Sequence, residues 1–439
     1  MHIRSSSFFA ALLAGVLALP LLYVGSAQAI PAFTRQHKTE CFTCHTVFPE
    51  LTEQGENFKK NSYVWLETKG AKKESKKDEK KDGKKGLNER EYLILSSLPD
   101  YVPLSISGAF NASYDDQRPD DGNRFDFVTR YVRLQGAGSM NDKLGFWLSY
   151  NLYTEGPFTG NTTNASLNGN VPANNTPDLS DAYVQARHIF STPVNFKAGR
   201  IRPSLSLWKG TNRTSVTEMA TTWYTVGDSL FYTDAAADGM EFNTILNGRV
   251  FLAGGAVKRK NQKNIDGYGS IQLKLGGADF EGREAPLNLD EDSIFDYLTV
   301  TLGIYGYTGT NNVGLNKQVN HYHRVGAEGD FRYQRYRLKL ASAFGNDDNA
   351  VVDSAFVSGP QTGSQSRVYA AEALYLIGSE LIPSFRYEYQ DDGASITRRY
   401  IPTLAYAALQ NAKVVLEYKH QDTSKLTDNT VNASLVVAF

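Results

Sequence analysis

From Leu104 to the last residue the sequence repeats short segments in which apolar and polar side chains alternate, and this alternation restricts the fold more than any other feature. Because successive side chains of a β-strand point to opposite faces, each segment predicts a strand with one apolar and one polar face. The segments have the ~9–11 residues, or slightly more, that a tilted strand needs to cross a membrane. The last segment is the clearest, with an apolar face formed by Val431, Ala433, Leu435, Val437 and Phe439.

The alternation predicts sixteen strands, an even number as in bacterial barrels. They are expected at 104–114, 124–138, 143–155, 178–190, 194–206, 239–247, 248–260, 267–280, 294–308, 321–333, 335–346, 366–377, 380–391, 397–408, 412–422 and 429–439. Short and long connections mostly alternate, as expected for periplasmic turns and outer loops. Residues 281–293 break this rule, so a miscounted strand at this position is left as an alternative. The expected fold class is mainly β, a transmembrane antiparallel β-barrel over residues 101–439.

A soluble β-sandwich or propeller alternates equally well. The chain is rich in Tyr and Phe, however, and aromatic residues on the outward face near strand ends form the girdles of membrane barrels. A terminal Phe after the last strand also resembles the recognition end of such barrels. We therefore expect a barrel in the bacterial outer membrane, with membrane lipid as a partner. The formal net charge of -1 gives no polyanion-binding signal, so nucleic acid is not an expected partner.

Residues 1–29 match a secretory signal peptide. Arg4 precedes an apolar stretch from Phe8 to Val24, and the small residues Ala27 and Ala29 mark a cleavage site. An uncleaved N-terminal anchor is the alternative. After this segment no run approaches the ~20 apolar residues of a membrane-spanning helix.

Residues 41–45 read Cys-Phe-Thr-Cys-His, the spacing of covalent c-type haem attachment. Cys41 and Cys44 are expected to form the two thioethers of one haem c, and His45 to be the proximal ligand of its iron. The alternatives are a redox CxxC motif and half of a zinc site. The first expects a βαβ pattern around it and the second expects two further ligands at short spacing, and neither is present.

The sixth ligand of the iron is left open. His37, four residues before the first thiol, is the candidate distal ligand, although such a histidine is more often a solvated side chain. Met219 and Met240 lie in or beside a long loop and are weaker candidates. An iron with five ligands, or with water as its sixth ligand, is the remaining alternative.

The sequence around this motif resembles the haem module of fused monohaem cytochrome-porins, the outer-membrane iron oxidases of iron-oxidising bacteria. The similar residues are Phe33 and Arg35, the haem motif, the run Phe48 to Thr52, and Phe58-Lys59 followed by Asn61 and Tyr63. Ser62 departs from the family, which usually has Gly there. The resemblance implies a small, mostly helical cytochrome c-like module at 30–68 that takes electrons from extracellular Fe(II).

Two further segments each have more than one interpretation. Residues 69–100 form a Lys-rich linker, which is either a docking patch for an acidic cytochrome or simply a solvated spacer. The stretch Asp181 to Arg187 with Phe196 to Arg200 is similar to phosphate-selective porins, which implies that Arg187, Arg200 and Arg202 line the lumen. Such arginines attract anions, lie beside haem propionates, or pair with lumenal acids.

The expected function is electron transfer across the outer membrane, from extracellular Fe(II) through one haem to a periplasmic c-type cytochrome. In this interpretation the protein is an iron oxidase and the barrel is a sleeve around the haem module. Acids of the outer loops, Asp115, Asp116, Asp120 and Asp121, are weak candidates for recruiting Fe(II). A porin for anions or small solutes with an accessory haem, and an exporter of electrons, are the alternatives.

Overall fold

The computed structural model describes residues 33, 37, 39, 41–64, 104–117, 124–141, 143–154, 178–209, 213–227, 229–259, 264–283, 298–313, 318–352, 361–378, 380–393, 395–424 and 426–438. The expected signal peptide at 1–29 and the expected linker at 69–100 lie outside these residues, as do Arg35, Asp120, Asp121 and Phe439. None of the described helices is long and apolar enough to cross a membrane.

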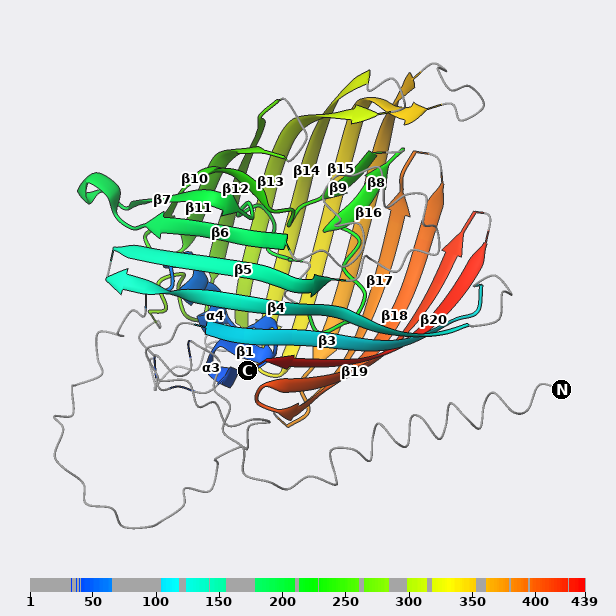
Figure 1. Cartoon of the computed structure of the whole chain (residues 1–439), viewed down its shortest axis with the longest axis horizontal. Coiled ribbons are helices and arrows are strands. Elements are labelled where there is room, and N and C mark those ends of the chain that lie inside the picture. Colours follow the sequence, from blue (N-terminus) through cyan, green and yellow to red (C-terminus); the bar gives the residue numbers. More distant parts are fainter. Residues whose placement is uncertain are drawn as a thin grey trace, which may run out of the picture.

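Sixteen antiparallel strands of the described chain form one closed barrel (Figure 1). Each overlaps one predicted strand, so the prediction of a barrel of about sixteen strands is confirmed. The strands are β3 (Leu104–Asp115), β4 (Phe125–Asn141), β5 (Leu144–Thr154), β6 (Asp178–Ala186), β7 (Val194–Ile201), β10 (Ala237–Leu246), β11 (Val250–Lys258), β12 (Asp266–Leu275), β13 (Leu298–Val313), β14 (Gln318–Tyr333), β15 (Tyr336–Val352), β16 (Gln361–Tyr375), β17 (Leu381–Asp391), β18 (Ile396–Leu409), β19 (Ala412–Thr423) and β20 (Thr427–Ala438).

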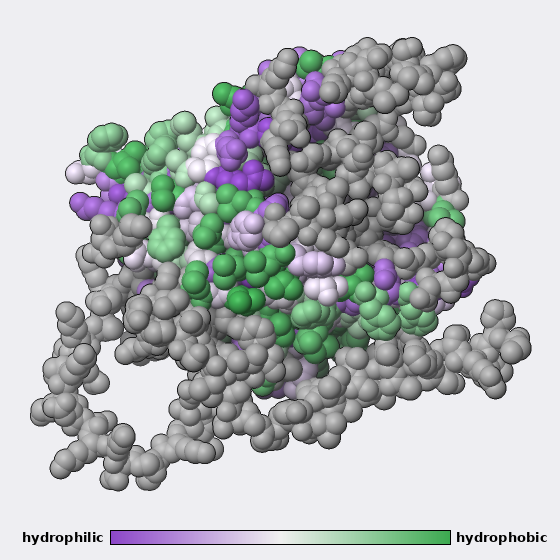
Figure 2. Space-filling view, in the orientation of Figure 1, coloured by the Kyte–Doolittle hydropathy of each residue, from purple (hydrophilic) through white to green (hydrophobic). Residues whose placement is uncertain are grey.

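The wall of the barrel is apolar outside and polar inside, as the alternation predicts. On β12, for example, Ile271 and Leu273 are exposed, whereas Ser270, Gln272 and Lys274 between and beside them are buried in the lumen. Figure 2 shows hydrophobic residues across the outer face of the wall. An outward apolar face with a polar interior is the arrangement of a barrel in lipid.

Short and long connections between strands lie at opposite ends of the barrel, with one exception. The ends of β4, β14 and β18 are followed by connections of only two residues, whereas β5, β7 and β15 are followed by long loops at the opposite end. The connection from β12 to β13, residues 276–297, is long although it lies at the end with short turns. β12 pairs directly with β13, so no strand of the barrel lies between them.

The long connection from β7 to β10 folds back into the barrel, where sequence reasoning predicted only a loop. It carries a hairpin of β8 (Trp223–Val226) and β9 (Ser229–Tyr232), visible inside the barrel in Figure 1. Tyr224 and Phe231 of the hairpin pack with wall residues that include Tyr305, Tyr307 and Tyr322. The segment therefore fills part of the lumen against one side of the wall.

The N-terminal module contains α3 (Cys41–Cys44), β1 (His45–Val47), β2 (Glu50–Leu51) and α4 (Glu53–Lys60). Thr52 caps α4, since its side chain accepts a hydrogen bond from the backbone N of Gly55. The expectation of a mostly helical module is met only by α3 and α4. Residues 46–49 combine β-branched and aromatic side chains with Pro49, which disfavour helix, so this stretch lies in or beside the β1–β2 pair.

Candidate functional site

The module lies within the barrel at the end with the short turns (Figure 1). The backbone N of Cys41 donates to Oε1 of Gln410, in the turn between β18 and β19, over 3.1 Å. The side-chain amides of Asn57 and Asn61 donate to the carbonyl oxygens of Asp279 and Phe280, each over 2.9 Å. The long connection after β12 thus holds α4. Because short turns of bacterial barrels are periplasmic, the module occupies the periplasmic end.

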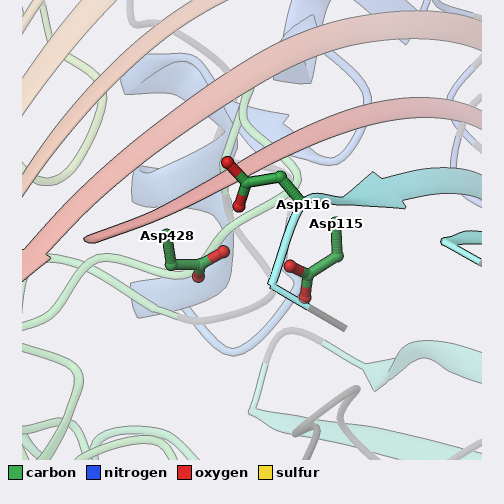
Figure 3. Close-up of side chains that lie close together, drawn as sticks. All are labelled: Asp115, Asp116 and Asp428. Carbon is green, nitrogen blue, oxygen red and sulfur yellow. The ribbon is translucent and has the colours of Figure 1, made fainter. Parts of the chain in front are cut away.

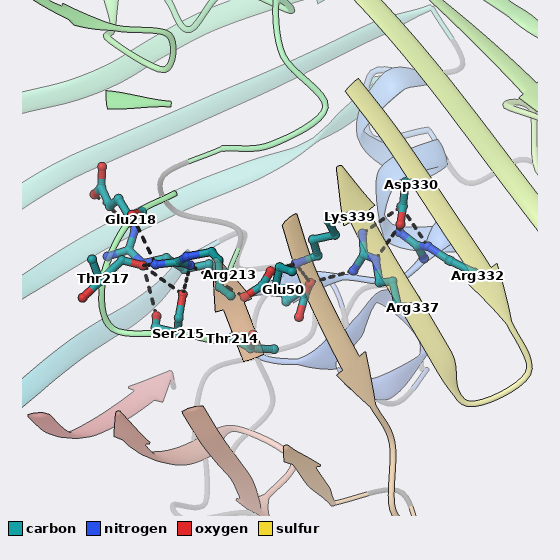
Figure 4. Close-up of polar contacts among 12 residues, drawn as sticks. Glu50, Arg213, Thr214, Ser215, Thr217, Glu218, Asp330, Arg332, Arg337 and Lys339 are labelled. Atoms are coloured by element: carbon teal, nitrogen blue, oxygen red, sulfur yellow. Dashed lines mark hydrogen bonds and ion pairs between the residues drawn. The ribbon is translucent and has the colours of Figure 1, made fainter. Parts of the chain in front are cut away.

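A buried carboxylate ties the module to the wall most strongly (Figure 4). Oε1 of Glu50 lies 2.6 Å from Nη1 of Arg337 and 2.5 Å from Nζ of Lys339, both on β15. Arg337 also pairs with Asp330 over 2.8 Å. All four side chains are nearly excluded from solvent, and Lys339 also pairs with Glu372 over 3.0 Å, so Glu50 is part of a buried network of alternating charges.

Two further acids of the module pair with the wall from α4. Glu53 lies 3.3 Å from Lys274 of β12, and Glu56 lies 3.2 Å from Arg332 of β14. These acids are about a fifth to a quarter exposed, so each pair contributes less than the Glu50 contacts. Together they place every described acid of the module against a basic residue of the barrel.

On the opposite side the module touches β5 and β6. The hydroxyls of Tyr63 and Tyr183 lie 2.7 Å apart, and the Tyr63 ring stacks on Trp147 at 5.5 Å between centroids. A Cβ at Gly145 would lie 2.0 Å from the carbonyl oxygen of Ser62. The absence of a side chain at Gly145 is therefore required for this contact.

This contact makes a testable prediction. Gly145→Ala should push the module off β5 and weaken docking by about 1–3 kcal/mol, the usual cost of overpacking. Proteolysis between residues 41 and 64 should then become faster in detergent micelles. Gly306→Ala, whose added Cβ meets nothing within 4 Å, is the matched control. Equal rates for both variants would contradict the docking.

A cavity of about 970 Å³ lies between the module, the inner wall and the β8–β9 hairpin. His37, Cys41, Cys44 and His45 all border it, so the structure brings the four predicted site residues together. The volume is at the upper end of the range of cofactor sites in proteins. The arrangement therefore offers room for a large ligand directly beside the Cys-Phe-Thr-Cys-His motif.

His45 has the properties of a metal ligand. Its Nδ1 is enclosed and has no hydrogen-bond partner among the described residues, and of its two ring nitrogens only Nδ1 is enclosed in this way. Burial lowers the pKa of His45 to about 4, so the imidazole is neutral at ordinary pH. A neutral imidazole is the form that binds iron.

No disulfide joins Cys41 and Cys44. Burial raises the pKa of Cys44 to about 11, which keeps this thiol protonated and argues against a reactive redox pair. Among the described residues, the groups of three or more His, Cys, Asp and Glu side chains that are close enough to hold a metal ion do not include these cysteines. A four-ligand zinc site here has no support in that part of the chain.

The candidates for a distal ligand differ in whether they border the cavity. His37 borders the cavity, and its ring lies 6.4 Å from Phe33 and 5.4 Å from Phe58 between centroids. Burial lowers the pKa of His37, so it too is neutral. Met219 is buried against Trp208 away from the cavity, and Met240 faces outward, half-exposed, on β10. Met240 therefore does not reach inward, and Met219, although it lies in the inward-folded connection, does not border the cavity.

Basic side chains outnumber acidic ones along the cavity, eleven to five. Arg200 and Arg202 line it as expected, but Arg202 pairs with Asp181 and Asp234, each over 3.1 Å. Arg187 is buried, and its Nη2 lies 3.5 Å from Oδ1 of Asn61 in the module. The interpretation of these arginines as partners of lumenal groups is therefore the better one for Arg187 and Arg202.

Asp115 and Asp116 lie at the opposite rim, together with Asp428 at the start of β20 (Figure 3). Carboxylate oxygens of the three lie within 4.8 Å of one another. Asn429 donates to both carboxylate oxygens of Asp116, and Lys419 pairs with Asp428 over 3.3 Å. This acidic rim, which sequence reasoning found only in part, faces the extracellular end.

The fold and its lumen define the chain as an outer-membrane barrel of the porin class. Residues 105–340 match the family model of phosphate-selective porin O and P, which covers more than half of the chain. The chain belongs to this family. It is therefore a protein of the bacterial outer membrane, as predicted. No curated protein matches it.

Solved porins share the barrel at low sequence identity. The anion-selective porin from Comamonas acidovorans is 12% identical with a TM-score of 0.53, over 76% of this chain and 99% of that one. OmpT of Vibrio cholerae, refolded in vitro, is 10% identical with a TM-score of 0.50, over 77% of this chain and 99% of that one. These similarities concern the fold alone.

Proposed function

We propose that the protein carries one covalent haem c at Cys41, Cys44 and His45 and transfers electrons across the outer membrane, from extracellular Fe(II) to a periplasmic c-type cytochrome. The observation that carries the proposal is the position of the motif, which borders a large cavity inside a membrane barrel. Its resemblance to iron-oxidising cytochrome-porins supports Fe(II) as the donor.

The residues present fit a haem. The thiols of Cys41 and Cys44 would form the thioethers, and His45 would bind the iron, with His37 available on the border of the same cavity. When bound, the haem supplies the one-electron couple of its iron. The protein holds the module rigidly through Glu50 and excludes lipid and much water from the lumen.

The barrel explains how one haem can serve two compartments. A bilayer core of ~30 Å is too thick for a haem outside the membrane to accept electrons directly from a donor on the other side. Here the motif lies inside the wall, at the periplasmic end, with the cavity extending from it toward the hairpin. The cavity reaches Asn311 and Asn312 near the extracellular end of β13, so it offers Fe(II) a way from the outer rim toward the motif. There Fe(II) would give one electron to the haem and become Fe(III), and the haem would pass the electron to the periplasmic partner.

The test is anaerobic mixing of Fe(II) with the purified, oxidised holoprotein in a stopped-flow spectrometer. We expect the haem absorbance to change to that of the ferrous form. A spectrum that stays ferric at all Fe(II) concentrations would exclude iron oxidation, and would leave electron export for a test with reduced protein and external acceptors.

An anion-conducting porin with an accessory haem is the second candidate. The family match and the excess of basic side chains along the cavity favour it. The two functions differ in conductance, because a module anchored in the lumen should block ions. Planar lipid bilayers should show little current for an electron conduit, and a steady anion-selective current for a porin.

A further inference from the structure

Three β-bulges lie side by side in the wall next to the cavity. Arg130 of β4 has no partner on β3, Leu152 of β5 has none on β4, and Ser180 of β6 has none on β5. A bulge changes which side chains face inward. On β4 it turns two successive residues, Arg130 and Tyr131, toward the lumen, where both border the cavity with Arg133.

Arg130 and Arg133 carry charges that the protein does not neutralise by direct pairing. Among the described residues neither forms an ion pair, and Arg133 has one hydrogen bond, from Nε to Oδ1 of Asn151 over 2.7 Å. The Arg133 guanidinium also lies 4.7 Å from the centroid of the Tyr131 ring. Uncompensated guanidinium groups in a half-buried position call for an anion.

The acids near the two arginines are already engaged. Asp181 binds Arg202 and accepts from the Trp147 indole over 3.0 Å. Glu218 pairs with Arg213 over 3.1 Å, and Glu417 accepts from backbone N–H groups of the inward loop. The described part of the chain thus offers Arg130 and Arg133 no unengaged acid among these neighbours, which favours a bound anion as their partner.

The strand register places these arginines level with the haem motif. Arg133 pairs with Ser107, and Ser107 pairs with Ala438. Ala438 is hydrogen-bonded to Asn411, which neighbours the Gln410 that holds Cys41. Three strand spacings of ~4.8 Å separate the backbones of Arg133 and Asn411, about 15 Å in all. A tetrapyrrole attached at Cys41 bridges such a span with its carboxylate arms.

We propose that Arg130 and Arg133 bind the propionate carboxylates of the haem and thereby raise its reduction potential. The inference rests on the proposed function. Removing either positive charge leaves the propionates less compensated, and the ferric state, which has one more positive charge than the ferrous state, gains stability. The bulge at Arg130 is the device that supplies two guanidinium groups from one strand.

The experiment is spectroelectrochemical titration of the full-length holoprotein with Arg130→Gln, Arg133→Gln and both together. Each single variant should shift the ferrous–ferric equilibrium about threefold toward ferric and the double variant about tenfold, which is 59 mV for one electron. The propionate bending band in resonance Raman spectra should move as well. Arg200→Gln, which removes a charge from the same cavity, is the control and should leave that band unchanged.

Three results would overturn the inference. Haem-loaded variants with the potential and Raman band of the wild type show that the arginines do not meet the propionates, while the proposed function stands. Inorganic phosphate that shifts the potential of the wild type but not of the double variant shows that the arginines bind a free anion instead. Wild-type protein purified without covalent haem overturns the proposed function as well.

Discussion

The double variant Cys41→Ala Cys44→Ala should lose its haem completely and no longer react with Fe(II). Both cysteines border the cavity outside any disulfide, and the sequence has no other cysteine to form a thioether. Without the covalent link, a short module has too little apolar surface to retain the cofactor. The mass of the intact protein and the haem absorbance measure the loss directly.

The control is Thr43→Ala, within the same motif, which removes only a hydroxyl hydrogen-bonded to that of Thr39 over 2.7 Å. It should keep the haem. Both variants should still form the barrel, which their heat-dependent mobility in gels can check. A double variant that keeps a covalent haem, with the barrel folded, would contradict the assignment.

The second large effect is expected at Glu50. Glu50→Gln removes the charge through which the module binds Arg337 and Lys339, whereas Asp330 and Glu372 still pair with these two bases. The module loses its buried ion pairs, at a cost of up to about 3–5 kcal/mol. The module should then detach from β15 and open the lumen. Single-protein conductance in planar bilayers should rise from near zero to that of an open barrel.

Glu56→Gln is the matched control, because its ion pair with Arg332 is partly exposed and contributes less.

Glu50 also predicts a pH dependence. Burial by itself raises the pKa of Glu50. The positive charges of Lys339 and Arg337 lower it by a larger amount, so the net shift is downward. Its stabilisation is complete above the ordinary carboxyl pKa of ~4.3 and is lost as pH falls through the lowered value. Conductance that rises already near neutral pH would refute this.

The barrel could be predicted almost strand by strand because its pattern is local. Each strand faces lipid on one side and polar groups of the lumen on the other, so apolar and polar residues alternate in every segment. The long connection 276–297 broke the loop rule for a reason that sequence does not reveal. Its residues Asp279 and Phe280 hold α4, a contact more than two hundred residues away along the chain.

The Cys-Phe-Thr-Cys-His motif, which predicts a haem site, was also easy to find in the sequence, since residues at fixed spacing form it. The surroundings of the motif could not be predicted from the sequence. The short β8–β9 hairpin alternates over only four residues per strand, too few to stand out from a loop. Arg130 was missed because a bulge reverses the parity of β4, and parity was the only guide to which side chains face the lumen. Register errors of one residue invert that assignment.

The position of the module also determines when it can be assembled. Glu50 meets Lys339, 289 residues further along the chain, and Cys41 meets Gln410, 369 residues further. The part of the chain that is exported first thus needs partners that arrive last. Docking of the module must wait until β15 and the turn after β18 are in place, so it can serve as the final step of maturation. A barrel that stalls before closure should leave the N-terminal segment exposed to periplasmic proteases.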